Sequence, residues 1–115
     1  MGEEIILWLE KLKEYWLNKD INKIIGLFDK SVSYYESSSL KIPYENLSNE
    51  WEVINGQNNI FLEFDVFVSH KQKHAVIWKL EYLNNLGKKE SYSGTYLIEL
   101  NDENLCTYFL QVCEE

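Results

Sequence analysis

The fold is decided by residues 59–113, which contain four long segments rich in β-branched and aromatic residues. The segments are NIFLEFDVFVSH (59–70), HAVIWKLEYLN (74–84), ESYSGTYLIEL (90–100) and NLCTYFLQVC (104–113). Stretches of alternating apolar and polar residues within them are typical of β-strands with one buried face. Strands of about ten residues are roughly twice the usual length, and long antiparallel strands twist and curl. We therefore expect a strongly curved sheet that forms a cone with a cavity when helices close it.

Short polar turns separate the four segments, so an antiparallel meander is expected. The alternation predicts that one set of side chains faces the helices: Ile60, Leu62, Phe64, Val66, Val68, Val76, Trp78, Leu80, Tyr82, Tyr92, Gly94, Tyr96, Ile98 and Leu100. The opposite set is expected to face outward: Phe61, Glu63, Asp65, Ser69, Lys79, Glu81 and Glu99. The last strand has no clean polar face. The outer face of the sheet is therefore predicted to be a homodimer interface.

The N-terminal half is predicted to be mainly helical. Apolar residues recur at helical spacing over residues 3–19. Asp20 is expected to cap a second helix, whose apolar face includes Phe28. A first strand follows at SVSYYES (31–37), and Pro43 is expected to open a third helix that ends near Ile54. The prediction is an α+β fold: three N-terminal helices packed on a strongly curved, mostly antiparallel sheet, in one domain over residues 1–115.

Composition limits the classes of partner. The chain has 19 Asp+Glu against 11 Lys+Arg, a formal net charge of -8. Phosphate backbones are bound by clustered Lys and Arg, so neither nucleic acid nor an anionic membrane is an expected partner. No apolar run approaches the ~20 residues of a membrane span. The first residues lack the basic region and cleavage site of a signal peptide, which predicts a cytoplasmic protein. Cys106 and Cys113 lie too far apart on one strand to bond to each other, so both are expected to be reduced and buried.

Three segments carry a resemblance to a known superfamily: WLNKDINKIIGLFDKSVSYYE (16–36), a helix that ends in NEW (49–51), and AVIWKLEYLNNLGKKESYSGTYLIELNDENLCTYF (75–109). In this order they resemble the nuclear-transport-factor-2-like superfamily, in its SnoaL-like branch. The resemblance covers nearly the whole chain and implies a cone-shaped cystatin-like roll. The superfamily includes ketosteroid isomerases, polyketide cyclases, dehydratases, epoxide hydrolases and plain binding or dimerisation modules, so the fold leaves the activity open.

Glu36 and Tyr96 are the candidate catalytic residues. In ketosteroid isomerases a carboxylate near the end of the first strand abstracts a proton beside a carbonyl, and the resemblance places Glu36 there. An acid in apolar surroundings has a raised pKa, which suits a general base. In that family a Tyr on the first helix and a protonated acid on a later strand both donate hydrogen bonds to the oxyanion. The resemblance aligns the Tyr with Leu12, which cannot donate, and the acid with a position near Tyr96, so Tyr96 is the one remaining donor. The alternative is that Glu36 is a solvated acid at a strand end.

Large aromatic side chains are the candidate wall of the cavity: Trp16, Tyr35, Trp51, Phe64, Trp78, Tyr82 and Tyr96. Such a set suits a flat apolar molecule, with phenol and indole groups to orient it. The alternative is that these rings simply fill the core of a small domain. Gly94, in the middle of a strand, is expected to mark a bend or bulge.

No cofactor or metal site is expected. His70 and His74 flank a predicted turn, without a nearby cysteine, so exposed turn histidines are expected there instead of a zinc site. A glycine-rich phosphate loop is missing from the sequence. Three functions remain open: a protein that binds an apolar small molecule, a cofactor-independent isomerase, cyclase or dehydratase that uses Glu36, and a non-catalytic dimerisation module.

Overall fold

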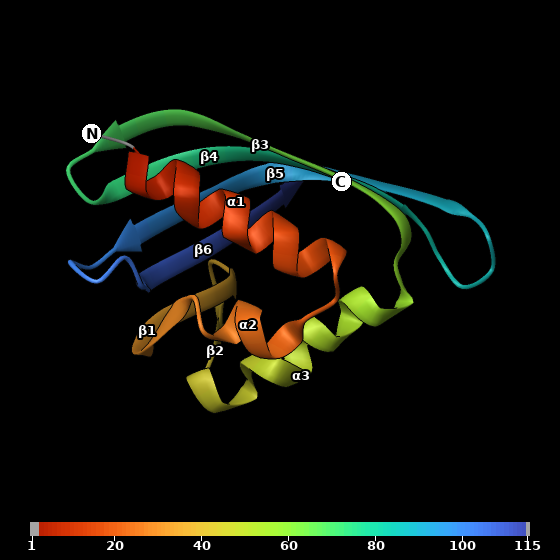
Figure 1. Ribbon diagram of the computed structural model, residues 1–115, viewed down its shortest axis with the longest axis horizontal. Coiled ribbons are helices and arrows are strands. Elements are labelled where there is room, and N and C mark those ends of the chain that lie inside the picture. The colour runs from red at the N-terminus through yellow and green to blue at the C-terminus, as the bar shows by residue number, and fades with distance from the viewer. Residues whose placement is uncertain (1–2, 115) are drawn as a thin grey trace.

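One six-stranded sheet, in the order β2-β1-β6-β5-β4-β3, is the framework of the protein. The computed structural model describes residues 3–114 (Figure 1). The helices are α1 (Glu3–Leu17), α2 (Ile21–Ile25) and α3 (Leu47–Trp51), with 3-10 turns at Tyr44–Asn46 and Glu52–Gly56 on either side of α3. The strands are β1 (Phe28–Ser37), β2 (Leu40–Ile42), β3 (Asn58–His70), β4 (Lys73–Leu83), β5 (Lys89–Leu100) and β6 (Cys106–Glu114).

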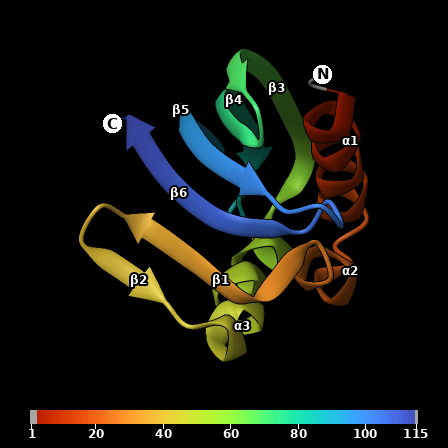
Figure 2. The ribbon, with the colours of Figure 1, turned by 90° about the vertical axis from the view of Figure 1, so that its left-hand side faces the viewer.

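The predicted meander is confirmed. Strands β3 to β6 pair antiparallel with their sequence neighbours, and β6 then pairs in parallel with β1. Figure 2, which looks along the molecule, shows the strands curving around the side on which the helices lie. The predicted α+β fold with a curved, mostly antiparallel sheet and three N-terminal helices is thus confirmed.

Helix α1 closes the inner face of the sheet. It buries Ile5, Trp8, Leu9, Leu12 and Trp16, which are five of the six residues on the predicted apolar face, and the sixth, Tyr15, is half-buried. The indole Nε1 of Trp8 donates a hydrogen bond of 3.0 Å to the carbonyl of Leu27, which ties α1 to the start of β1. Burying five large apolar side chains, at about 1.5–3 kcal/mol each, is the main contribution of α1 to stability.

The second helix is shorter than predicted. Asp20 caps it as expected, because its carboxylate accepts a hydrogen bond of 3.1 Å from the backbone N–H of Lys23. The helix ends at Ile25, however, so Phe28 belongs to β1 and not to a helical face. Pro43 precedes a 3-10 turn, and the predicted third helix is one α-helical turn between two 3-10 turns. The short strand β2 was not predicted.

A β-bulge reverses the predicted faces at the end of β3. Val66 pairs with Val76, but Val68 pairs with Ala75, so Phe67 is an extra residue without a partner in β4. Val68 is 55% exposed and lies on the outer face. The alternation had predicted that Val68 would face inward and that Ser69 would face outward. The prediction for both residues is wrong, because one inserted residue exchanges the faces of every residue after it.

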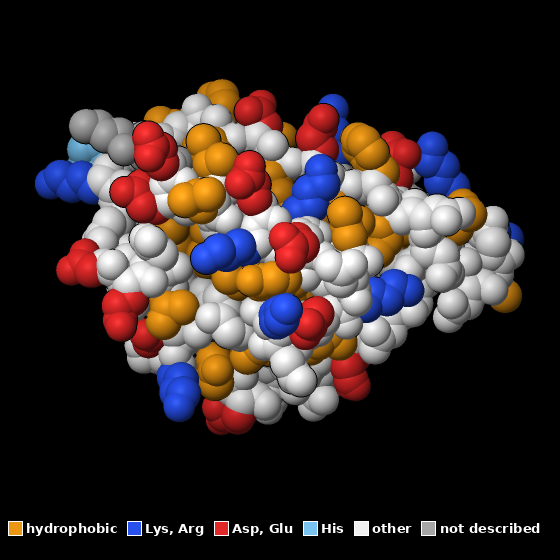
Figure 3. Space-filling model, viewed as in Figure 1, with side chains coloured by type: hydrophobic (Ala, Val, Ile, Leu, Met, Phe, Trp, Pro, Cys, Tyr) orange, Lys and Arg blue, Asp and Glu red, His pale blue; other side chains and the backbone are white. Residues whose placement is uncertain are grey.

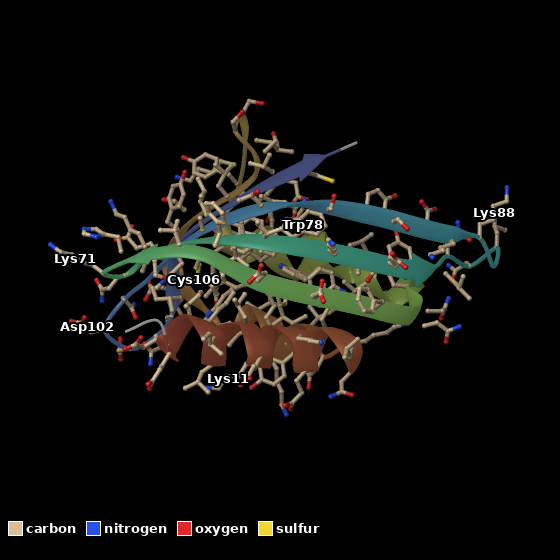
Figure 4. All side chains as sticks on the ribbon, turned by 90° about the horizontal axis from the view of Figure 1, so that it is seen from above. Lys11, Lys71, Trp78, Lys88, Asp102 and Cys106 are labelled. Atoms are coloured by element: carbon tan, nitrogen blue, oxygen red, sulfur yellow. The ribbon has the colours of Figure 1, made fainter. Side chains whose placement is uncertain are left out.

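Beyond that bulge the predicted inner face is largely confirmed. The buried residues on it include Leu62, Val76, Trp78, Leu80, Tyr96, Ile98 and Leu100. Tyr92 also faces inward as predicted, on the same face as its partner Leu80, although its side chain is 39% exposed. In Figure 4 the labels Lys71 and Lys88 mark the two ends of the long strands, and Trp78 lies between them.

Candidate functional site

A cavity of about 280 Å³ lies between the inner face of the sheet and the segment around α3. Five of the predicted wall residues surround it, namely Trp16, Trp51, Trp78, Tyr82 and Tyr96. Tyr34 and Tyr92 add two further rings. The carboxyl groups of Glu36 and Glu50 and the amides of Gln57 and Gln111 supply most of its polar lining. These side chains come from all parts of the chain, so the cavity forms only when the sheet curls.

The aromatic walls are held by ring packing. Trp78 and Tyr96 stack with ring centroids 5.4 Å apart and an interplanar angle of 19°. Trp16 and Trp51 meet edge to face, 4.9 Å apart at 90°. Both separations lie within the range of favourable aromatic pairs. Ring packing therefore helps to hold these walls in place.

Two indole N–H groups in these walls have no hydrogen-bond partner. The Nε1 of Trp16 donates to the buried amide oxygen of Gln57 over 2.8 Å. The Nε1 atoms of Trp51 and Trp78 are equally buried, but neither finds an acceptor. Their side chains are only 6% and 3% exposed. An unsatisfied buried donor costs about 1–3 kcal/mol, so these two groups are unfavourable for stability in the packed wall.

Glu36 is a partly buried carboxyl group on the cavity wall. Burial raises its pKa above the usual 4.5, and the negative charge of Glu50 raises the pKa further. The Nε2 of Gln111 lies 3.4 Å from its Oε1, a long hydrogen bond. No Lys, Arg or His is among the described residues that line the cavity. The site therefore gathers two carboxyl groups, and no basic side chain lies among its described lining residues.

Tyr96 keeps its phenol proton over the whole physiological range. The side chain is almost completely buried, and this burial raises its pKa well above 10, with smaller contributions from Glu36 and Cys113. Tyr34 behaves in the same way, because burial and then the charge of Glu36 raise its pKa. Tyr96 can thus donate a hydrogen bond but cannot serve as a base.

Comparisons with known proteins find similarity in structure only. No protein-family model matches the chain, and no curated protein matches it. AclR from Streptomyces galilaeus superposes with a TM-score of 0.83 at 13% identity, covering 99% of this chain and 80% of its own. The Δ5-3-ketosteroid isomerase from Mycobacterium sp. gives 0.75 at 15% identity, covering 95% and 92%. An NTF2-like protein of unknown function from Exiguobacterium sp. gives 0.69 at 15% identity, covering 85% and 86%.

The chain has the nuclear-transport-factor-2-like fold. At these identities the likeness shows the fold alone. Within this fold the described cavity lies inside the curled sheet, and Glu36 and Tyr96 both line it.

Two predicted wall residues lie elsewhere in the nuclear-transport-factor-2-like fold. Tyr35 does not line the cavity: it follows Tyr34 on β1, and successive residues of a strand face opposite sides. Its ring packs 5.8 Å from that of Tyr108, with the Nζ of Lys41 6.0 Å from its centroid. Phe64 packs against the core, 6.0 Å from the ring of Tyr96, without reaching the cavity.

Sequence reasoning missed several polar residues of the cavity. Tyr34 could have been found, since it shares a strand face with Glu36. Gln111 faces Glu36 because β6 pairs in parallel with β1, a pairing for which the sequence carries no local signal. Glu50 and Gln57 come from the segment around α3, whose position depends on the tertiary packing.

The histidines differ from the predicted pair of turn residues. His70 is exposed, whereas His74 lies in β4, is buried, and has its Nδ1 2.7 Å from the Oγ of Ser69. Burial lowers the pKa of His74. Over residues 3–114 no group of three or more His, Cys, Asp and Glu is arranged to hold a metal ion. Cys106 is buried as expected, but Cys113 is exposed. None of the described helices is long and apolar enough to cross a membrane.

Proposed function

We propose that this protein binds a small, mostly apolar molecule in the aromatic cavity. The observation that carries the proposal is the cavity itself, whose wall combines three tryptophan and four tyrosine side chains with a few polar groups. Rings supply apolar contact area, and a few polar groups orient the ligand, which is the usual composition of ligand sites. At about 280 Å³ the cavity lies at the small end of ligand pockets, so it suits a compound of one or two rings.

Thermal denaturation with a panel of neutral aromatic compounds, including indole, naphthol and β-tetralone, tests this proposal. A compound that binds only the folded protein raises the melting temperature. At a concentration one hundred times its Kd, such a compound adds roughly 2.7 kcal/mol to the free energy of unfolding. Tyr82→Trp, which narrows the cavity, should abolish the shift. Tyr35→Trp is the matched control, because it makes the same change outside the cavity. No shift with any compound, or equal shifts in both variants, would count against binding at this site.

Proton transfer beside a carbonyl group is a second candidate function. It is favoured by the placement of Glu36 and Tyr96 around one cavity. A carboxyl group with a raised pKa suits a general base near neutral pH, and the protonated phenol of Tyr96 can stabilise a developing oxyanion. The solved ketosteroid isomerase of the same fold acts on ketosteroids, as its name states, and supports this candidate by analogy only.

A homodimer through the outer face of the sheet is proposed as well. Exposed apolar side chains gather there, among them Val68, Ile77, Leu97 and Val112. Val68 and Leu97, with Ala75 and Tyr108, also line a hollow of about 420 Å³. An exposed apolar surface of this kind favours association. By contrast, the face crossed by α1 carries acidic and basic side chains interspersed (Figure 3). The cytoplasmic location stays a prediction from the sequence.

A further inference from the structure

We propose that the natural ligand of this cavity is an organic cation: an aromatic amine that also carries a hydroxyl or carbonyl group. This inference rests on the proposed function and names the class of molecule bound. It is built from three features of the cavity wall, namely its charge, its ring faces and its two unpartnered donors.

The charge of the wall selects a cation. Glu36 and Glu50 both line the cavity, whereas none of the described lining residues is basic. Burial is the main cause of the raised pKa of Glu36, and the charge of Glu50 raises it further, so the two carboxyl groups repel each other when both are ionised. An ammonium group bound beside them would relieve that repulsion, and an anionic ligand would increase it. The formal net charge of -8 also attracts cations toward the protein.

The ring faces strengthen that selection. Three tryptophans and four tyrosines line the cavity, so an ammonium group within it lies close to several π-systems. A cation over the face of Trp or Tyr gains about 0.5–2 kcal/mol, more when water is excluded. A neutral apolar ligand would use the same rings for contact area but would leave the negative charge of the carboxyl groups uncompensated, since Glu36 accepts only a long hydrogen bond from the neutral amide of Gln111.

The unpartnered donors add a second requirement. The Nε1 atoms of Trp51 and Trp78 are buried without an acceptor. A saturated or purely aromatic amine would fill the cavity and leave both donors unsatisfied. A hydroxyl or carbonyl oxygen on the ligand can accept from them when the wall shifts to uncover the two N–H groups. Sites that hydrogen-bond a ligand in this way discriminate strongly against analogues that lack the polar group. The ligand is therefore expected to carry a cationic end and an oxygen acceptor.

Four small probes of similar shape separate these requirements. Tyramine carries the ammonium group and a hydroxyl; phenethylamine lacks the hydroxyl; p-ethylphenol lacks the charge; and phloretate has a carboxylate in place of the amine. Isothermal titration calorimetry at neutral pH should show that tyramine binds roughly tenfold more tightly than p-ethylphenol. Phenethylamine should bind roughly tenfold more weakly than tyramine, because it offers the indoles no acceptor. Phloretate should bind most weakly.

A charge variant tests the origin of the preference. Glu36→Gln keeps the size of the side chain and removes its charge, so the ratio of the tyramine and p-ethylphenol affinities should fall toward one. Glu103→Gln removes the same charge in the turn between β5 and β6 and does not line the cavity, so it should keep the ratio. Circular dichroism of both variants checks that they fold, and the four-probe series on the unaltered protein does not depend on them.

The outcomes separate this inference from the proposed function. If p-ethylphenol binds as tightly as tyramine, or if phloretate binds best, the cation inference is overturned while small-molecule binding stands. Binding of phenethylamine as tight as that of tyramine would overturn the acceptor requirement. If neither these probes nor the neutral panel bind, both proposals fail together.

Discussion

Among single residues, Glu36 combines an ionisable group with a place on the cavity wall. Its pKa in the folded protein is raised above 4.5, mainly by burial and then by Glu50. The folded state thus holds the proton more tightly than the unfolded state. The stability that Glu36 contributes is full below its unfolded pKa and is lost as the pH rises through the folded value. At neutral pH the ionised carboxylate therefore destabilises the fold.

Replacing Glu36 by Gln should stabilise the ligand-free protein at about pH 7.5 and leave it nearly unchanged at about pH 4, where the carboxyl group is protonated. Because the group is partly exposed and screened by water, the gain should stay below about 1 kcal/mol. Urea denaturation at the two pH values measures it, with Glu103→Gln as the surface control. A loss of stability at the higher pH, or an equal change at both, would show that Glu36 is well solvated.

The same variant tests proton transfer. If Glu36 is a general base, the protein accelerates exchange of the α-hydrogens of β-tetralone for deuterium in heavy water, as followed by NMR. Glu36→Gln should slow this exchange by about 10²-fold or more, the usual contribution of a general base. Exchange that is equally fast in both proteins would exclude Glu36 as the base. The prediction for urea denaturation of Glu36→Gln would stand independently of that result.

At the scale of elements, the approach of β6 to β5 depends on Gly94. The register between the two strands passes through Gly94, paired with Cys113, without an interruption. Of the expected bend or bulge, the bulge is therefore absent at this position, and the close approach of the neighbouring backbone explains the glycine. A Cβ atom there would lie 1.9 Å from the carbonyl oxygen of Val112 and 2.9 Å from its carbonyl carbon. Both are backbone atoms of the neighbouring strand, so they cannot rotate away.

Gly94→Ala should therefore destabilise the protein by more than about 2 kcal/mol, through displacement of β6. Gly26→Ala is the matched control, since Gly26 has φ of -65° and its Cβ would meet only ordinary contacts of 3.4 Å or more. That variant should be neutral or more stable by up to about 1 kcal/mol, because alanine has fewer unfolded conformations. Similar thermal melting curves for the two variants would contradict this account of β5 and β6.

Elements also show where local patterns fail. The alternation in β4 predicted its buried residues Val76, Trp78 and Leu80, because each strand position is tied to a face. The same rule failed after Phe67, since the bulge there is set by pairing with β4 and carries no signal of its own. The predicted helix of 43–54 is likewise divided into three short helical segments, which its apolar spacing did not indicate.

For the whole molecule, the outer face of the sheet is the proposed dimer surface. Leu97 lies at its centre, between Ala75 of β4 and Leu110 of β6, and is 40% exposed. Leu97→Lys should convert a dimer to a monomer, because a lysine at the centre of an apolar interface loses its hydration. Light scattering after size-exclusion chromatography measures the mass. Leu86→Lys, at an 81% exposed position in the β4–β5 turn, should leave the mass unchanged.

A mass of one chain for the unaltered protein would overturn the dimer proposal directly. If the unaltered protein and Leu97→Lys both have the mass of two chains, the dimer interface lies on another surface. Circular dichroism of the lysine variant confirms its fold, since Leu97 is not part of the buried core.

The sequence by itself determined the four long strands, the inward side of β4 and most of β5, the helix α1 with its buried face, and the cap at Asp20. These features depend on local periodicity and on hydrogen bonds between residues close in the chain. Only the tertiary structure decided which polar groups meet in the cavity. Glu36, Glu50, Gln57 and Gln111 come from separate elements, and the curvature of the sheet together with the parallel pairing of β1 and β6 brings them around one space. Whether Trp51 and Trp78 find acceptors also depends on those distant neighbours, so no local pattern could reveal the two unpartnered donors.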